Sequence, residues 1–190
     1  MAAPGRAAEI LDFWFGPVPG ARRRQWFVKD PDFDREIRER FLEDHRRARD
    51  RELDDWLAEP ASCLALVVLL DQFPRNMFRG APEAFAADAC ALAAARHAVE
   101  QGFDAGMPAE RRLFFYLPFE HSENLDDQRR CVALTEPFRA LPGFEDVHDY
   151  ALRHLRVIQR FGRFPHRNAV LGRTSTPEEA DFLKQQGSSF

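Results

Sequence analysis

Residues that can do chemistry gather in three proline-containing segments of the sequence. The first is Phe73-Pro74-Arg75-Asn76, and it returns with one residue inserted at positions 164–168 as Phe-Pro-His-Arg-Asn. Between them, residues 118–123 read Pro-Phe-Glu-His-Ser-Glu, in which Glu120 and Glu123 flank His121. A partly buried Glu and a His can both be tuned toward neutral pH, which suits them to general acid–base catalysis. Glu120 and His121 are therefore the candidate catalytic residues.

An arginine-rich stretch follows these segments. Residues 150–177 contain no acidic residue, yet they carry six arginines and two histidines. Guanidinium groups bind carboxylates and phosphates through two parallel hydrogen bonds, so the stretch indicates an anion site. The alternative is internal pairing, in which these arginines neutralise acidic residues of the same chain. The available partners are Asp71, Glu120, Glu123, Asp126 and Asp127.

Taken together, the three segments predict a polar pocket for a small anionic ligand or a peptide carboxylate. Its ligand-binding residues are predicted to be Asp71, Arg75, Glu123, Arg163, His166 and Arg167, beside the catalytic candidates. Two other functions stay open at this point. One is an enzyme, metal-dependent or not, that uses Glu120 and His121 as acid–base groups or ligands. The other is a protein-interaction module whose polar corners only lock helix ends together.

Several known site types find no support in the sequence. Neither HExxH nor paired ExxH motifs occur, so no residue is assigned to a metal, and no cofactor can be identified. GxSxG, GxGxxG and GxxxxGK[ST] are also missing. Cys63, Cys90 and Cys131 are widely spaced and read as free thiols. His45, His97 and His148 lie among charged or small residues and are expected at the surface.

Helices must position these side chains, and residues that begin or end helices occur along the whole sequence. Nothing alternates with a period of two for long enough to predict a sheet. Asp30-Pro31, Asn124 and Thr176-Pro177 are helix starts, and Gly16 and Gly162 are helix ends. The sequence predicts an all-α fold of about eight or nine antiparallel helices, either stacked in pairs or bundled.

Two further helix ends are predicted from prolines. The apolar run at residues 64–70 predicts a central buried helix that Pro74 breaks just after Asp71 and Gln72, because the residue before proline leaves the α region. A second helix, starting at Pro108, is expected to end before Pro118.

Composition and charge bound the remaining possibilities. The 190 residues are 45% hydrophobic and 31% charged, which predicts one globular domain over residues 1–190 with a frayed C-terminus. The longest charge-free run is too short to cross a membrane and no leader segment is recognised, so we expect a cytoplasmic protein without a membrane partner. A net charge of −4 argues against nucleic acid. A homodimer is left open.

Four blocks of sequence resemble domain-of-unknown-function family 924. They are residues 11–16, 70–76, 119–123 and 160–168, which read LDFWFG, LDQFPRN, FEHSE and RFGRFPHRN. The blocks are long and in the right order, so the resemblance spans nearly the whole chain. It implies a tetratricopeptide-like helical fold and brings no established activity, substrate or cofactor. Protein or peptide binding would follow only by analogy of fold.

Overall fold

The computed structural model describes residues 4–188, and throughout that range the chain forms helices joined by short turns, with no strand. The all-α prediction is confirmed. The α-helical segments are α1 (Pro4–Phe15), α2 (Pro31–Arg49), α3 (Pro60–Val67), α4 (Phe73–Met77), α5 (Asp88–Glu100), α6 (Ala109–Glu120), α7 (Leu125–Thr135), α8 (Val147–Phe161) and α9 (Pro177–Phe182). Short helical turns between them are η1 (Arg24–Trp26), η2 (Asp54–Ala58), η3 (Val68–Gln72), η4 (Pro82–Phe85), η5 (Glu136–Ala140) and η6 (Pro165–Arg167).

The predicted capping residues do begin and end the helices. The side chain of Asp30 accepts two backbone N–H groups at the start of α2, and Asn124 does the same for α7. Thr176 forms a capping box at the start of α9. Gly16 and Gly162 follow α1 and α8 with φ of 72° and 68°, the left-handed conformation that glycine adopts without steric cost.

The central helix differs from the prediction, because Pro74 does not end it. The turn η3 is π-helical, and the Phe73 N–H donates to the Val68 carbonyl, five residues back. The backbone stays in the α region at both junctions, so α3, η3 and α4 form one continuous helix. Proline lacks the N–H of a regular turn, and one wider turn lets the helix pass it. Asp71 therefore lies inside a helix, within the wide turn.

The second proline expectation is also wrong. Helix α6 runs through Pro118 to Glu120 instead of ending before it. Pro118 stands in the last turn, where only one backbone hydrogen bond is lost, and the apolar side chains on both sides of it are buried. This extension places Glu120 and His121 at the C-terminal end of α6.

Two of the three histidines expected at the surface are buried. His45 follows Phe41 by four residues, so it continues the apolar stripe of α2 into the core, where its Nδ1 lies 2.9 Å from the Leu69 carbonyl oxygen. His148 is likewise buried, between Thr135 and Glu136. His97 is half-buried. Helical periodicity outweighs the charge of the sequence neighbours in deciding which side chain faces inward.

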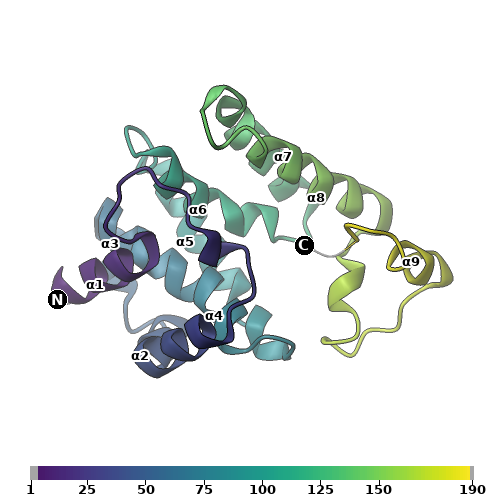
Figure 1. Ribbon diagram of the computed structural model, residues 1–190, viewed down its shortest axis with the longest axis horizontal. Coiled ribbons are helices and arrows are strands. Elements are labelled where there is room, and N and C mark those ends of the chain that lie inside the picture. The colour runs from purple at the N-terminus through teal and green to yellow at the C-terminus, as the bar shows by residue number, and fades with distance from the viewer. Residues whose placement is uncertain (1–3, 189–190) are drawn as a thin grey trace.

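The helices pack around three apolar clusters, and in the N-terminal part α1 packs against α3 and α2 against α4. The largest joins α1 to α6 and surrounds Trp14, whose ring contacts those of Trp26, Phe33, Phe73 and Phe114. A second cluster lies where α5 to α8 meet, and a third joins α8 to Phe164. Figure 1 shows α1 to α6 grouped on one side and α7 to α9 on the other.

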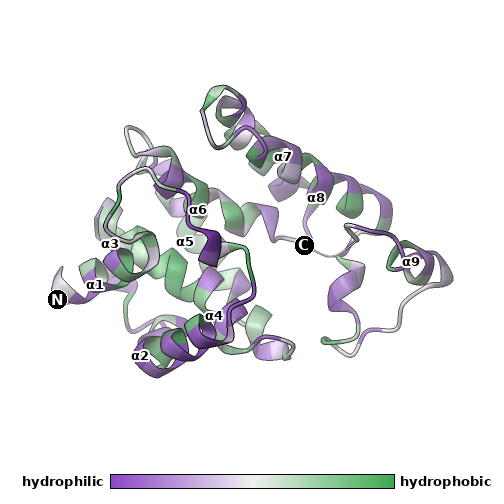
Figure 2. Cartoon of the chain, viewed as in Figure 1, coloured by the Kyte–Doolittle hydropathy of each residue, from purple (hydrophilic) through white to green (hydrophobic). Residues whose placement is uncertain are grey.

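The surface pattern follows from this packing. In Figure 2, α2, α7 and α8 each carry both hydrophilic and hydrophobic residues, as expected of helices with one buried face. No helix in the described range is both long and apolar enough to span a bilayer. The tetratricopeptide-like pairing stays a prediction.

Candidate functional site

Eight ionisable side chains meet where the wide turn η3, the end of α6 and the turn η6 come together. We call them the polar cluster: Asp71, Arg75, Asp88, Glu120, His121, His154, His166 and Arg167. Six of them are predicted site residues. The π-helical turn and Pro118 position the first two segments, because both helices continue past their prolines into the cluster.

Asp71 is the centre of the cluster. Its side chain is 1% exposed, its Oδ1 lies 2.7 Å from His121 Nδ1 and 3.4 Å from Arg75 Nη1, and its Oδ2 accepts from the Gln72 amide. Burial acts to raise the pKa of Asp71, but the charges of Arg75 and His121 outweigh it and hold that pKa well below its usual range. Asp71 is therefore a buried carboxylate at neutral pH.

Two arginines share one carboxylate on the other side of the cluster. Arg75 binds Asp88 through two hydrogen bonds of 3.0 and 3.2 Å, and Arg167 Nη1 lies 3.4 Å from the same group. The Arg167 guanidinium lies over the rings of Phe85 and Phe164, with its Cζ 4.8 and 4.6 Å from their centroids. Burial, with the charge of Arg75 adding to it, lowers the pKa of Arg167 to about 10. Arg167 thus remains a cation at neutral pH.

Two members of the polar cluster, Glu120 and His154, are uncharged at neutral pH. Burial, with the charge of Asp71 adding to it, raises the pKa of Glu120 to about 8, whereas burial lowers the pKa of His154 to about 3. The His154 Nδ1 lies 3.5 Å from Glu120 Oε1, and Cys131 Sγ lies 3.9 Å from Glu120 Oε2. At neutral pH Glu120 is protonated and His154 uncharged, so their contact is not an ion pair.

His121 and His166 lie at the more accessible side of the cluster. The His121 side chain is 16% exposed. Burial and the charge of Arg75 lower its pKa, against the opposing effect of Asp71. Burial, followed by the charge of Arg167, lowers the pKa of His166 to about 4. Both imidazoles are therefore neutral above pH 7, in the form that can accept a proton.

Two predicted ligand-binding residues are engaged elsewhere. Arg163 pairs with Glu179 and the Thr174 carbonyl, beside α9. The Glu123 carboxylate accepts two hydrogen bonds from Arg173, of 2.7 and 2.9 Å, and one from the Phe164 N–H. The internal pairing that the sequence left open holds for Glu123, whereas Arg163 pairs with Glu179, which was not among the expected partners. The Glu123 charge still acts on Arg167.

Three participants were not singled out for the site from the sequence. Asp88 is the first residue of α5, and its sequence neighbours give no sign of a site. Gln128 is fully buried in α7, and its amide donates to the Phe119, Glu120 and Ser122 carbonyls at 3.3, 2.6 and 2.7 Å. It thereby fixes the end of α6 that carries His121. Nothing in the sequence around Phe85 indicates that its ring would contact a site arginine.

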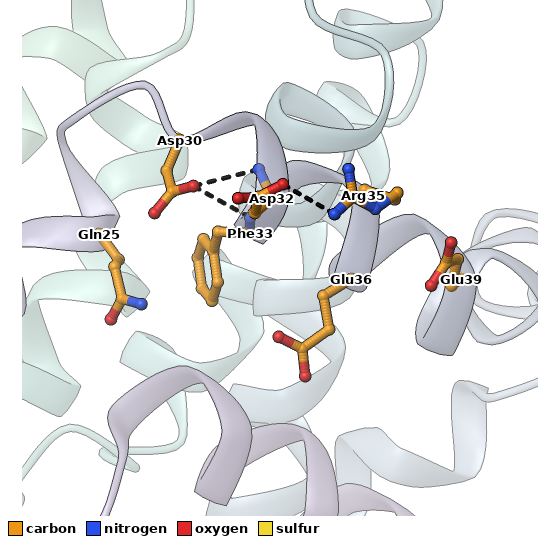
Figure 3. Close-up of a pocket in the computed structure, with 7 residues that line it drawn as sticks. All are labelled: Gln25, Asp30, Asp32, Phe33, Arg35, Glu36 and Glu39. Atoms are coloured by element: carbon orange, nitrogen blue, oxygen red, sulfur yellow. Dashed lines mark hydrogen bonds and ion pairs between the residues drawn. The ribbon is translucent and has the colours of Figure 1, made fainter.

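A separate hollow of about 330 Å³ opens on α2, away from this cluster. Figure 3 shows two of the carboxylates that line it engaged locally, since Asp30 caps α2 and Asp32 pairs with Arg35. Across residues 4–188, the polar cluster included, no group of three or more His, Cys, Asp or Glu side chains is arranged to hold a metal ion.

Comparison with known proteins gives a family without an assigned activity. The family described as "Bacterial protein of unknown function (DUF924)" matches residues 10–187. A solved structure described as a protein of unknown function, ATU0120 from Agrobacterium tumefaciens, is 43% identical in sequence. The match covers 95% of this chain and 97% of that one, with a TM-score of 0.86. None of the curated proteins compared with the chain matches it.

Proposed function

Given that the chain belongs to the DUF924 family of bacterial proteins, we propose that it binds a small anion, a carboxylate or a phosphate, at Arg167 and Arg75. A free peptide C-terminus carries the same carboxylate chemistry. The observation that carries the proposal is the incomplete pairing of the buried Arg167 guanidinium.

Arg167 is only 7% exposed, yet among the described residues its one ion pair is the long contact with Asp88. Its Nε is buried and has no hydrogen-bond partner among the described residues. A guanidinium has five N–H donors, and removing it from water without acceptors is costly. An anion that accepted from Nε and a terminal nitrogen would offset this cost through a bidentate pair.

The surrounding groups support an anion over a cation. Asp88 is already bound by both oxygens to Arg75, and the Asp71 carboxylate is occupied by His121, Gln72 and Arg75. Contact with the two Phe rings restricts the guanidinium, which lowers the entropy lost on binding.

Thermal unfolding and titration calorimetry test the proposal with inorganic phosphate, acetate, and one short peptide with a free or an amidated C-terminus. Sodium chloride at matched ionic strength controls for screening. A ligand at one hundred times its Kd stabilises the fold by about 2.7 kcal/mol. We expect a stabilising anion for the wild type and none for Arg167→Met, which keeps an apolar side chain against the two rings.

Arg160→Ala is the matched control, because Arg160 is an exposed arginine of α8 paired with Glu178. It should bind the anion as the wild type does. Arg167→Lys should bind more weakly, since a lysine keeps the charge but loses the planar fork. If no probe stabilises the wild type, or if Arg167→Met binds equally well, the anion site is refuted and an interaction module becomes the better reading.

A further inference from the structure

The hydrogen bond between His121 and Asp71 fixes the state of the imidazole. The Asp71 carboxylate can only accept, so the proton must be on His121 Nδ1, 2.7 Å away. The other ring nitrogen, Nε2, then carries the lone pair. Within the described part of the chain Nε2 makes no hydrogen bond, and it is not among the buried polar atoms that lack a partner, so it is open to solvent.

Asp71 also connects His121 to the arginines of the proposed anion site. One oxygen of Asp71 contacts both His121 and Arg75, at 2.7 and 3.4 Å. Arg75 in turn shares Asp88 with Arg167. The imidazole is therefore linked to the arginine pair through the Asp71 carboxylate, which is buried and bound by the Gln72 amide.

We propose that His121 Nε2 is a general base that removes a proton from a hydroxyl group or a water molecule beside the bound anion, with Asp71 as its positioning residue. This rests on the proposed function, which supplies the anion. The substrate class is an anionic compound, a carboxylate or phosphate, whose reaction begins with loss of an O–H proton. The chain is then an enzyme and not only a binding protein.

The step is a proton transfer that balances within the site. The O–H bond breaks, its electron pair stays on the oxygen, and a new N–H bond forms at Nε2. Asp71 keeps its negative charge and compensates the imidazolium, as the carboxylate of a Ser-His-Asp triad does. Arg75 and Arg167 stabilise the negative charge that remains on the substrate.

Diethyl pyrocarbonate is the probe, because it acylates neutral imidazole nitrogens and the sites can be read by peptide mass spectrometry. In the wild type at pH 7.5 we expect His121 to react fastest of the histidines. In Asp71→Asn the His121 rate should fall on the order of tenfold, since an amide no longer enforces the Nδ1–H tautomer. His97, half-buried on α5 with Nε2 3.0 Å from the Leu57 carbonyl, is the internal control and should not change.

A second measurement on the wild type guards against an unfolded Asp71→Asn variant. Long-range ¹H–¹⁵N NMR should show His121 as the Nδ1–H tautomer, and the Nε2–H tautomer would overturn the proposal. So would a His121 rate that is no faster than that of His97 or that is unchanged in folded Asp71→Asn.

Added phosphate separates this proposal from the one on which it rests. Protection of His121 by phosphate, lost in Arg167→Met, supports both. If His121 reacts fast and depends on Asp71, but no anion protects it, the anion site fails while the base at Nε2 stands.

Discussion

Arg163 and Glu179 form a bidentate ion pair, with 2.6 Å between Nε and Oε1 and 2.8 Å between Nη2 and Oε2. Glu179 is buried and also closes the capping box of α9. The pair joins the end of α8 to the start of α9. An arginine that the sequence places in a ligand site is thus committed to a tertiary contact.

We expect Arg163→Ala to lower the free energy of unfolding by more than Arg160→Ala does, without changing anion binding. The variant leaves the buried Glu179 carboxylate short of its cation, and breaking such pairs is costly. Urea unfolding measures the loss. Arg160→Ala removes the neighbouring exposed pair with Glu178 and should cost less than about 1 kcal/mol. Loss of phosphate binding by Arg163→Ala would return Arg163 to the site.

Glu120 should make the protein less stable as pH rises from 4.5 to 8. Its pKa is about 8 in the folded chain against 4.5 as an ordinary glutamate, so the folded state binds the extra proton in this window. Stability is then lost as pH rises from 4.5 to 8, by at most about 1.4 kcal/mol per pH unit.

His154 and His166 change stability with pH in the opposite direction to Glu120, and they do so at lower pH. The pKa values of His154 and His166 fall to about 3 and about 4 from 6.5, so their effect is lost stability as pH falls below 6.5. Between pH 6.5 and 8 the Glu120 effect should stand alone. Glu120→Gln mimics the protonated group. In this variant the free energy of unfolding, measured with urea, should depend less on pH between 6.5 and 8. If the free energy of unfolding changed equally with pH in the wild type and in Glu120→Gln, the raised pKa of Glu120 would be contradicted.

Gln128→Leu should destabilise the fold by about 3 kcal/mol. The substitution leaves the Phe119, Glu120 and Ser122 carbonyls at the end of α6 without their shared donor in a buried place. Arg129→Ala, one residue along α7 and paired within the described range with exposed Asp126, should change stability by less than about 0.5 kcal/mol. Chemical unfolding of both variants gives the comparison, and similar losses would mean that the cap is unimportant.

The three free cysteines should differ in reactivity. Cys63 and Cys131 are buried, and burial raises the pKa of Cys63 to about 12, whereas Cys90 is partly exposed on α5. Because the thiolate is the reactive form, a thiol reagent should label Cys90 first in the native protein. Mass spectrometry after brief labelling identifies the site. Equal labelling of all three before denaturant is added would show that the core opens readily.

The sequence alone determined the helices whose signals are local. Asp30, Asn124 and Thr176 cap helices because each side chain reaches the N–H groups two or three residues ahead, and such contacts need no tertiary partner. Gly162 ends α8 for an equally local reason, its positive φ. The all-helical fold followed from these signals and from the 3.6-residue period of the apolar side chains.

The tertiary structure decided whether the prolines end their helices and which charged residues pair. Pro74 and Pro118 read locally as helix ends, yet both helices continue, because burial of their flanking apolar residues outweighs one missing hydrogen bond. The pairing of Arg163 with Glu179 and of Glu123 with Arg173 depends on contacts 16 and 50 residues apart in sequence. Helix packing decides which charged residues pair when they are far apart in sequence. The same packing buries Arg167 with incomplete pairing and brings His121 to Asp71.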